Sequence, residues 1–159
     1  MIASTTPTRV VGRAFRVLIV LEALSFVCFA LVHFGVRIPV GFAVIEEPAR
    51  PFAVIVEGLA AVVLALGASA VLTRRTWAWV AATGAHVIAL AGVLWGMVAV
   101  AAGRGPHTQL NDTYHLVMVV VLGAGLILLL TRRGRAVLDI RKPDPDPRSQ
   151  AGGGRPPSG

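Results

Sequence analysis

One apolar segment constrains the fold of this chain more than any other feature. Residues 51–73 lie between Arg50 and Arg74, and Glu57 is the only ionisable side chain among them. At a rise of about 1.5 Å per residue, a helix of this length crosses a hydrocarbon layer about 30 Å thick. The segment therefore predicts a membrane-spanning helix that holds a carboxyl group inside the bilayer.

Three further segments, residues 17–36, 77–102 and 113–131, are of similar length and equally apolar. Charged residues make up only 14% of the chain, whereas soluble domains carry about 25%. The sequence therefore predicts an all-α membrane domain of four transmembrane helices in an up-down-up-down bundle. Residues 1–16 are expected to be a basic leader, and residues 132–159 a basic, Pro- and Gly-rich disordered tail.

The basic residues are distributed unevenly between the two sides of this bundle. The leader, the turn at residues 74–75 and the tail together hold 12 basic and 3 acidic residues, whereas the loops at residues 37–50 and 104–112 hold 3 of each. The positive-inside rule then predicts a plasma-membrane protein with both termini in the cytoplasm. Since no aromatic residues are interleaved with the basic ones to stack on bases, we expect the lipid bilayer as partner and no nucleic acid.

The two loops on the other side differ in character. Residues 37–50 contain a largely apolar middle, residues 38–45, which we expect to lie in the membrane interface or to dip into the mouth of the bundle. Asn111, Asp112 and Thr113 stand at the start of the last apolar segment and are expected to cap its helix.

Five ionisable side chains fall within the predicted helices. Counting along each helix places Glu22 and His86 at one depth, towards the cytoplasm, and His33, Glu57 and His115 at a second, outer depth. Ionisable groups inside a membrane are functional candidates. They are also explained if each carboxyl or imidazole group only finds a hydrogen-bond partner across the bundle.

Glu22 and His33 are eleven residues apart, which brings a helix back to within about 20° of its starting face. One stripe of the first helix should therefore face the bundle and connect the two depths. Its members are Glu22, Ser25, Phe26, Phe29 and His33.

The chemistry open to these groups includes a proton relay or a site for a quinone-type headgroup, because Glu and His can exchange protons near neutral pH when they are desolvated. His33 and His115 lie at one depth on different helices, as bis-histidine haem ligation requires. No CxxCH, HExxH or clustered Cys and His motif is present. We therefore expect no metal site and no cofactor, with haem and quinone as alternatives, and we find no catalytic motif that indicates an enzyme.

Two further groups of residues are candidates on pattern alone. Polar residues near the start of the fourth helix can converge at the outer mouth of the bundle, although the same residues are typical of a helix start. They are His107, Asn111, Asp112 and Tyr114. Small residues are expected to mark helix-packing faces, where backbones approach closely. They are Gly92 and Gly96, which form a GxxxG pair, and Gly58 and Ala61.

The second helix and the end of the first together resemble a known family over about residues 16–90. The residues that carry the resemblance to the DoxX-like four-helix membrane proteins are Glu57, Gly58, Gly67, Arg74 and Arg75, with the pair His33 and Phe34. The resemblance implies a four-helix bundle that serves as an accessory subunit of a membrane oxidoreductase in quinone or sulfur chemistry. The resemblance also implies that Glu57 is the residue of this chain that matches a functional position of the family.

Three functions remain open from the sequence. The first is a non-enzymatic subunit or scaffold of a larger membrane assembly, formed with another membrane protein or as a homo-oligomer. The second is a redox-linked or proton-handling protein of quinone type that uses the buried Glu and His residues. The third is an oligomeric transporter of small molecules, since four helices alone enclose little volume.

Overall fold

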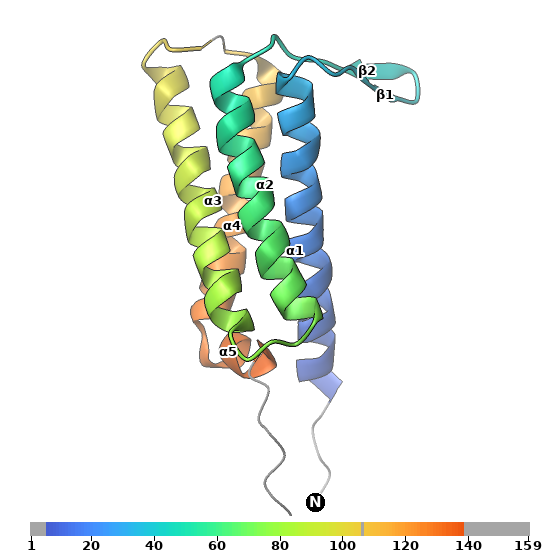
Figure 1. Ribbon diagram of the computed structural model, residues 1–159, viewed down its shortest axis with the longest axis vertical. Helices are drawn as coiled ribbons and strands as arrows, with labels where there is room; N and C mark the ends of the chain where they lie inside the picture. Colours follow the sequence, from blue (N-terminus) through green and yellow to red (C-terminus); the bar gives the residue numbers. More distant parts are fainter. Residues whose placement is uncertain (1–5, 106, 139–159) are drawn as a thin grey trace, which may run out of the picture.

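The computed structural model describes residues 6–105 and 107–138, and they form a bundle of helices (Figure 1). Four of these helices are long and apolar enough to cross a membrane, so the chain is an all-α, multi-pass membrane protein as predicted. In chain order the helices are α1 (Thr6–His33), α2 (Pro51–Leu72), α3 (Ala78–Ala101), α4 (Gln109–Leu130) and the short α5 (Arg132–Leu138).

The four long helices run up and down side by side, and each packs most closely on its neighbour in the chain. The start of α1 and the short helix α5 lie at one end of the bundle, here called the terminal end (Figure 1). The opposite end carries the connection between α1 and α2 and the connection between α3 and α4, and is called the hairpin end. The short connections at residues 73–77 and 102–108 make this antiparallel order the simplest one for the last three long helices.

The first helix is longer at its start than the sequence indicated. It begins at Thr6, inside the segment expected to be a leader, because arginine side chains mark the edge of the lipid without ending a helix. Phe15, in this added part, is buried in the core. At its other end α1 stops at His33, three residues earlier than expected, where Gly35 adopts a φ of 100° that continues no right-handed helix.

The fourth helix also begins earlier than predicted, at Gln109 and not at residue 113. Thr108 is the capping residue, since its hydroxyl accepts a hydrogen bond of 3.2 Å from the backbone N–H of Asn111. The prediction that Asn111, Asp112 and Thr113 cap the helix was therefore wrong, and all three residues lie inside it. Most of the tail expected to be disordered, residues 139–159, is outside the described residues.

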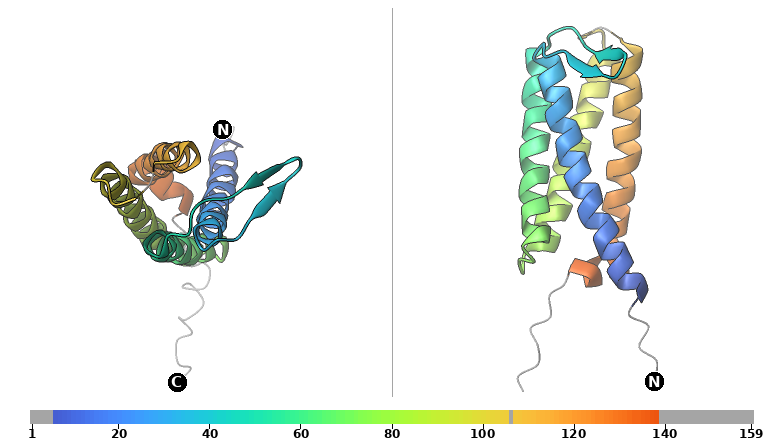
Figure 2. Two further views of the ribbon diagram at one scale, coloured as in Figure 1. Left: turned by 90° about the horizontal axis from the view of Figure 1, so that it is seen from above. Right: turned by 90° about the vertical axis from the view of Figure 1, so that its right-hand side faces the viewer.

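The connection between α1 and α2 contains a small antiparallel hairpin. Strands β1 (Ile38–Val40) and β2 (Ala43–Ile45) pair across a tight turn at Gly41, whose φ is 60°. In Figure 2 the side view places the hairpin at the level of the helix ends, and the view from above shows it extending past α1 and away from the bundle axis. It does not dip into the mouth of the bundle, which was one of the two positions expected for it.

The interior of the bundle holds the polar stripe that was predicted for the first helix. Glu22, Phe26 and His33 are buried, whereas Leu24 and Val27 on the other face are more than two-fifths exposed. Buried carboxyl and imidazole groups inside a shell of exposed aliphatic side chains are the arrangement expected of a protein whose solvent is lipid.

Small residues set the distances between neighbouring helices. A Cβ added at Gly67 of α2 would lie 3.2 Å from the Cβ of Ala85 on α3, so the two backbones approach closely there. Of the residues proposed for packing, Ala61 is buried and Gly92 faces Val56 of α2. Gly58 differs, because an added Cβ would meet no described atom within 4 Å.

Candidate functional site

A buried pair of side chains lies at the hairpin end of the bundle. His33 is the last residue of α1, Glu57 lies in the second turn of α2, and their Nδ1 and Oε2 atoms are hydrogen-bonded at 2.8 Å. Both residues are almost completely buried. The backbone N–H of Arg50 donates to the carbonyl oxygen of His33 at 2.9 Å, which holds the end of α1 against the start of α2. The pair therefore has a fixed geometry in which an imidazole and a carboxyl group are hydrogen-bonded to each other.

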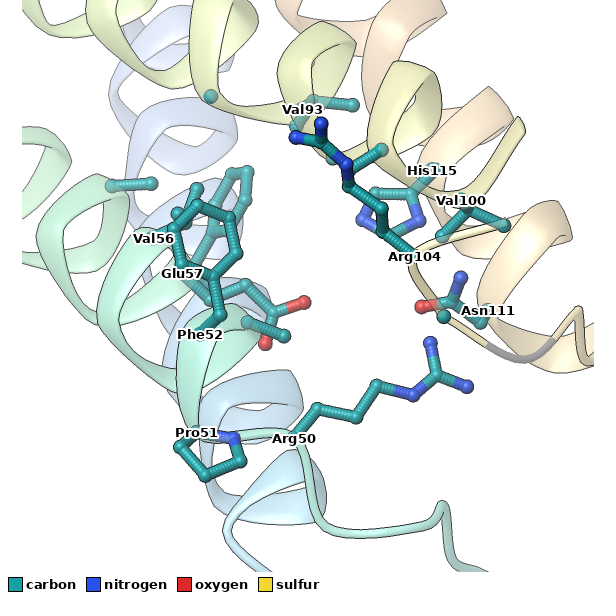
Figure 3. A pocket seen from close by; sticks show the side chains of 17 residues that line it. Arg50, Pro51, Phe52, Val56, Glu57, Val93, Val100, Arg104, Asn111 and His115 are labelled. Atoms are coloured by element: carbon teal, nitrogen blue, oxygen red, sulfur yellow. The ribbon is translucent and has the colours of Figure 1, made fainter. Parts of the chain in front are cut away.

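Glu57 also lines a pocket of about 260 Å³ that lies among the four long helices at this end (Figure 3). Most of its wall is apolar, and the polar side chains come from α2, α4 and the loops. The lining residues that matter most for its chemistry and shape are Arg50, Phe52, Glu57, Gly96, Arg104, Asn111 and His115. Because Phe52 and Arg104 are exposed, the pocket reaches the surface of the bundle.

The glycines of the GxxxG pair help to form this pocket. Gly92 and Gly96 both line it from α3, and a Cβ at Gly96 would lie 3.6 Å from Nε2 of His115. The missing side chains thus leave room between α2, α3 and α4. The pattern that indicated helix packing therefore also contributes to the open space of the pocket.

Three polar groups face one another across the pocket. Figure 3 shows the carboxyl group of Glu57 pointing into it from α2, with His115 and Asn111 on the opposite wall. Oε1 of Glu57 and both side-chain polar atoms of Asn111 are buried without a hydrogen-bond partner among the described residues. Burying such a group unpaired costs about 1–3 kcal/mol. A ligand that pairs with these atoms would recover that cost on binding.

Two arginines border the pocket. Arg50 extends towards Asn111, and Arg104 lies on the far side (Figure 3). The guanidinium group of Arg50 contacts Glu47 at 3.2 Å, and the hydroxyl of Thr108 donates to the other oxygen of Glu47 at 2.6 Å. This network ties the start of α2 to the start of α4, so the edge of the pocket is held from both sides.

An aromatic cluster closes the pocket site on the side of α1. The ring of Tyr114 stacks on Phe29 and meets Phe26 edge to face, and it lies beside His115. Tyr114 is buried in the second turn of α4 and faces these rings instead of the outer mouth of the bundle. These rings connect α1 to α4, which otherwise make few contacts with each other.

A second buried pair lies deeper, towards the terminal end. Oε2 of Glu22 on α1 lies 3.2 Å from Nε2 of His86 on α3, and His86 also stacks on Phe15. Nδ1 of His86 donates to the carbonyl oxygen of Ala82 at 2.8 Å, since a carbonyl can only accept. Nε2 is therefore the nitrogen that faces the carboxyl group.

The pocket beside Glu57 does not extend to this second pair, since neither Glu22 nor His86 lines it. Gly125 of α4 lies directly against the imidazole ring, where an added Cβ would be 2.7 Å from Nε2 and 2.9 Å from Cδ2. The space around Glu22 and His86 is thus filled by close helix packing. Their arrangement suits a buried structural contact between α1 and α3.

The candidate residues from the sequence thus separate into three groups. Glu57, His115 and Asn111 line the pocket, with His33 hydrogen-bonded behind Glu57, while Glu22 and His86 form the deeper pair. His107 and Asp112 contact each other at 3.3 Å on the exposed surface and do not line the pocket.

Sequence reasoning did not select Arg50, Arg104, Glu47 or Gly125. Each looks ordinary in the sequence, the first three as loop charges and the last as one small residue in an apolar run. The charges of Glu47 and Arg50 are plain in the sequence, but nothing there indicates that the side chain of Glu47 is only 2% exposed.

Within residues 6–105 and 107–138, no three His, Cys, Asp or Glu side chains come together as a group that could hold a metal ion. A scan against protein-family models, a search of curated proteins and a search of solved structures find no match to this chain.

Proposed function

We propose that this protein binds the polar head of a small, lipid-soluble molecule of quinone type in the pocket beside Glu57. The observation that carries the proposal is the set of buried, unpartnered polar atoms on Glu57 and Asn111 that face an otherwise apolar pocket. Pockets of this composition, mostly apolar with a few convergent polar groups, are typical of small-molecule sites.

The polar groups match the chemistry of a quinone and its reduced form. The amide nitrogen of Asn111 and a ring N–H of His115 can donate to carbonyl oxygens, and Oε1 of Glu57 can accept from a hydroxyl group. Phe52 and the valine side chains of the wall provide apolar contact for the ring. His33 is hydrogen-bonded to the other oxygen of Glu57. A proton that the ligand gives to Glu57 can therefore pass on to the imidazole of His33. The resemblance to DoxX-like proteins agrees with this class of ligand.

The test compares two buried carboxyl groups that differ in their surroundings. Glu57 and Glu22 each contact a buried histidine, but only Glu57 lines the pocket. In detergent-solubilised protein, decylubiquinone binding followed by quenching of tryptophan fluorescence should weaken about tenfold in Glu57→Gln, which corresponds to about 1.4 kcal/mol. The matched variant Glu22→Gln should bind as the wild type does.

Equal affinities in the two variants, or no saturable binding to the wild type, would contradict the proposal. Asn111→Leu provides a second measurement, because it removes the amide and keeps the size of the side chain. Gln109→Leu is its control, one that lies on the same turn of α4 and outside the lining of the pocket.

A role as subunit or scaffold of a larger membrane assembly is the second candidate. The exposed apolar hairpin at residues 38–45 is the feature that favours it, since such surfaces are often interfaces. This role predicts that a partner copurifies from native membranes and that Glu57→Gln changes nothing measurable in the assembly. An oligomeric transporter would show instead as protein-dependent uptake of a solute into vesicles.

We also propose that the terminal end faces the cytoplasm of the cell that makes the protein, with the bundle in the plasma membrane. The excess of basic residues in the leader, the turn at residues 74–75 and the tail supports this orientation. Protease added to intact cells should leave epitope tags at both termini uncut. Cleavage of either tag would refute the orientation.

A further inference from the structure

The hairpin at the edge of the bundle has an unusual composition. From Ile38 to Ile45 no side chain is polar, although the segment is eight residues long and lies outside the helices. In the strand register Val40 faces Ala43 on one side of the ribbon, and Val44 lies on the other. Because side chains alternate between the faces of a strand, both faces of this hairpin are apolar.

The bundle does not cover these side chains. Phe42 at the tip is fully exposed, and Val40 and Val44 are about half exposed. Figures 1 and 2 show the hairpin extending sideways from the helix ends, beyond α1. A hairpin that is apolar on both faces and borders water would be unfavourable, so a lipid or protein surface must cover it.

The level of the hairpin along the bundle is set by the helices that hold it. The 22 residues of α2 span about 33 Å, against about 30 Å for the hydrocarbon core of a bilayer. The end of α1 and the start of α2, joined through Arg50 and His33, therefore lie close to the boundary between acyl chains and headgroups. A ribbon leaving sideways from this point runs along that boundary.

Two properties favour the interface over the bilayer core. The hairpin has only two strands, so each strand has one edge whose backbone groups need partners that acyl chains cannot supply. At its base Arg37 and Glu46 form an exposed ion pair at 2.6 Å, which suits the headgroup layer.

We propose that the hairpin is an interfacial anchor whose occupant is the lipid bilayer, with Phe42 inserted at the boundary between headgroups and acyl chains. The hairpin then gives the α1–α2 pair an additional contact with the membrane surface, to one side of the two helices. Since it projects from one side of the bundle only, it opposes rotation and tilt of that pair in the membrane.

The test measures the depth of the hairpin tip. A nitrobenzoxadiazole fluorophore is attached to Phe42→Cys in a Cys28→Ser background, and the full chain is reconstituted in vesicles of phosphatidylcholine and phosphatidylglycerol. A label at Val44→Cys repeats the measurement on the second strand. Labels at His107→Cys and at Val120→Cys are the references, because His107 lies in the exposed polar loop at the same end and Val120 lies exposed in the middle of α4.

The label at position 42 should emit at shorter wavelength than the label at position 107 and should be shielded from iodide in the water. Quenchers attached near the headgroup should act on it more strongly than quenchers in the middle of the acyl chain, with the reverse order at position 120. Emission and iodide access equal to those at position 107 would overturn the proposal. So would shielding that disappears when the protein is diluted in lipid, because a second copy of the chain would then be the occupant.

Discussion

Gly125 offers a sharp test of the close packing around the Glu22–His86 pair. In Gly125→Ala the new Cβ would lie 2.7 Å from Nε2 and 2.9 Å from Cδ2 of His86. The ring cannot simply turn aside, since its Nδ1 is bonded to the carbonyl oxygen of Ala82 and its face is stacked on Phe15. Either α4 must move outward or the imidazole must leave its position.

The magnitude follows from three contributions. Overpacking a filled core costs about 1–3 kcal/mol. Loss of the hydrogen bond from His86 to Ala82 adds about 1 kcal/mol. Replacement of glycine by alanine inside a helix returns about 1 kcal/mol. The free energy of unfolding should therefore fall by about 2 kcal/mol.

Gly123→Ala is the matched control on the same helix. An added Cβ there meets no described atom within 4 Å, so only the helix propensity changes and stability should be equal or higher by up to about 1 kcal/mol. Unfolding by dodecyl sulfate in mixed micelles, followed by circular dichroism, gives both values. Equal stability of the two variants would refute the close approach of α4 to His86.

A double-mutant cycle identifies the cause of the loss. In a His86→Ala background the new Cβ at position 125 has no imidazole to meet. Gly125→Ala should then change the free energy of unfolding by no more than Gly123→Ala does. If the cost persisted in that background, the clash would lie elsewhere and the assigned packing would be wrong.

Two smaller effects follow from contacts at the helix ends. Thr108→Ala removes both the N-cap of α4 and the hydrogen bond to Glu47, and should lower stability by about 1–2 kcal/mol in the same unfolding assay. The exposed Thr113→Ala serves as its control, and an equal loss there would contradict the capping role. Trp79→Phe removes the bond from the indole N–H to the carbonyl oxygen of Leu129 at 2.9 Å, and should cost about 1 kcal/mol; no loss would show that this bond contributes nothing.

The resemblance to DoxX-like proteins and the proposed binding of a ligand both single out Glu57. Glu57 also has a structural role that does not depend on a ligand, because its hydrogen bond to His33 joins α1 to α2. Comparing it with Glu22 therefore separates a binding role from a structural one, because both carboxyl groups are buried against histidines.

The sequence alone determined the class of the protein and the depth of its buried groups. Four apolar segments long enough to span lipid identify a membrane bundle, because insertion depends on local length and hydropathy. The fixed rise of a helix then sets the depth of each polar residue. For this reason the sequence alone groups Glu22 with His86, and Glu57 with His33 and His115.

Only the tertiary structure decided how these groups are used. The rotation of each helix about its axis depends on packing, so the sequence did not reveal that Asn111 points into a pocket with Glu57 or that Gly125 lies against His86. The hairpin likewise arises from pairing between β1 and β2, and its sideways direction comes from how α1 and α2 end. The depth of a buried group in the membrane follows from its distance along one helix, whereas the groups that it contacts depend on the positions of several helices at once.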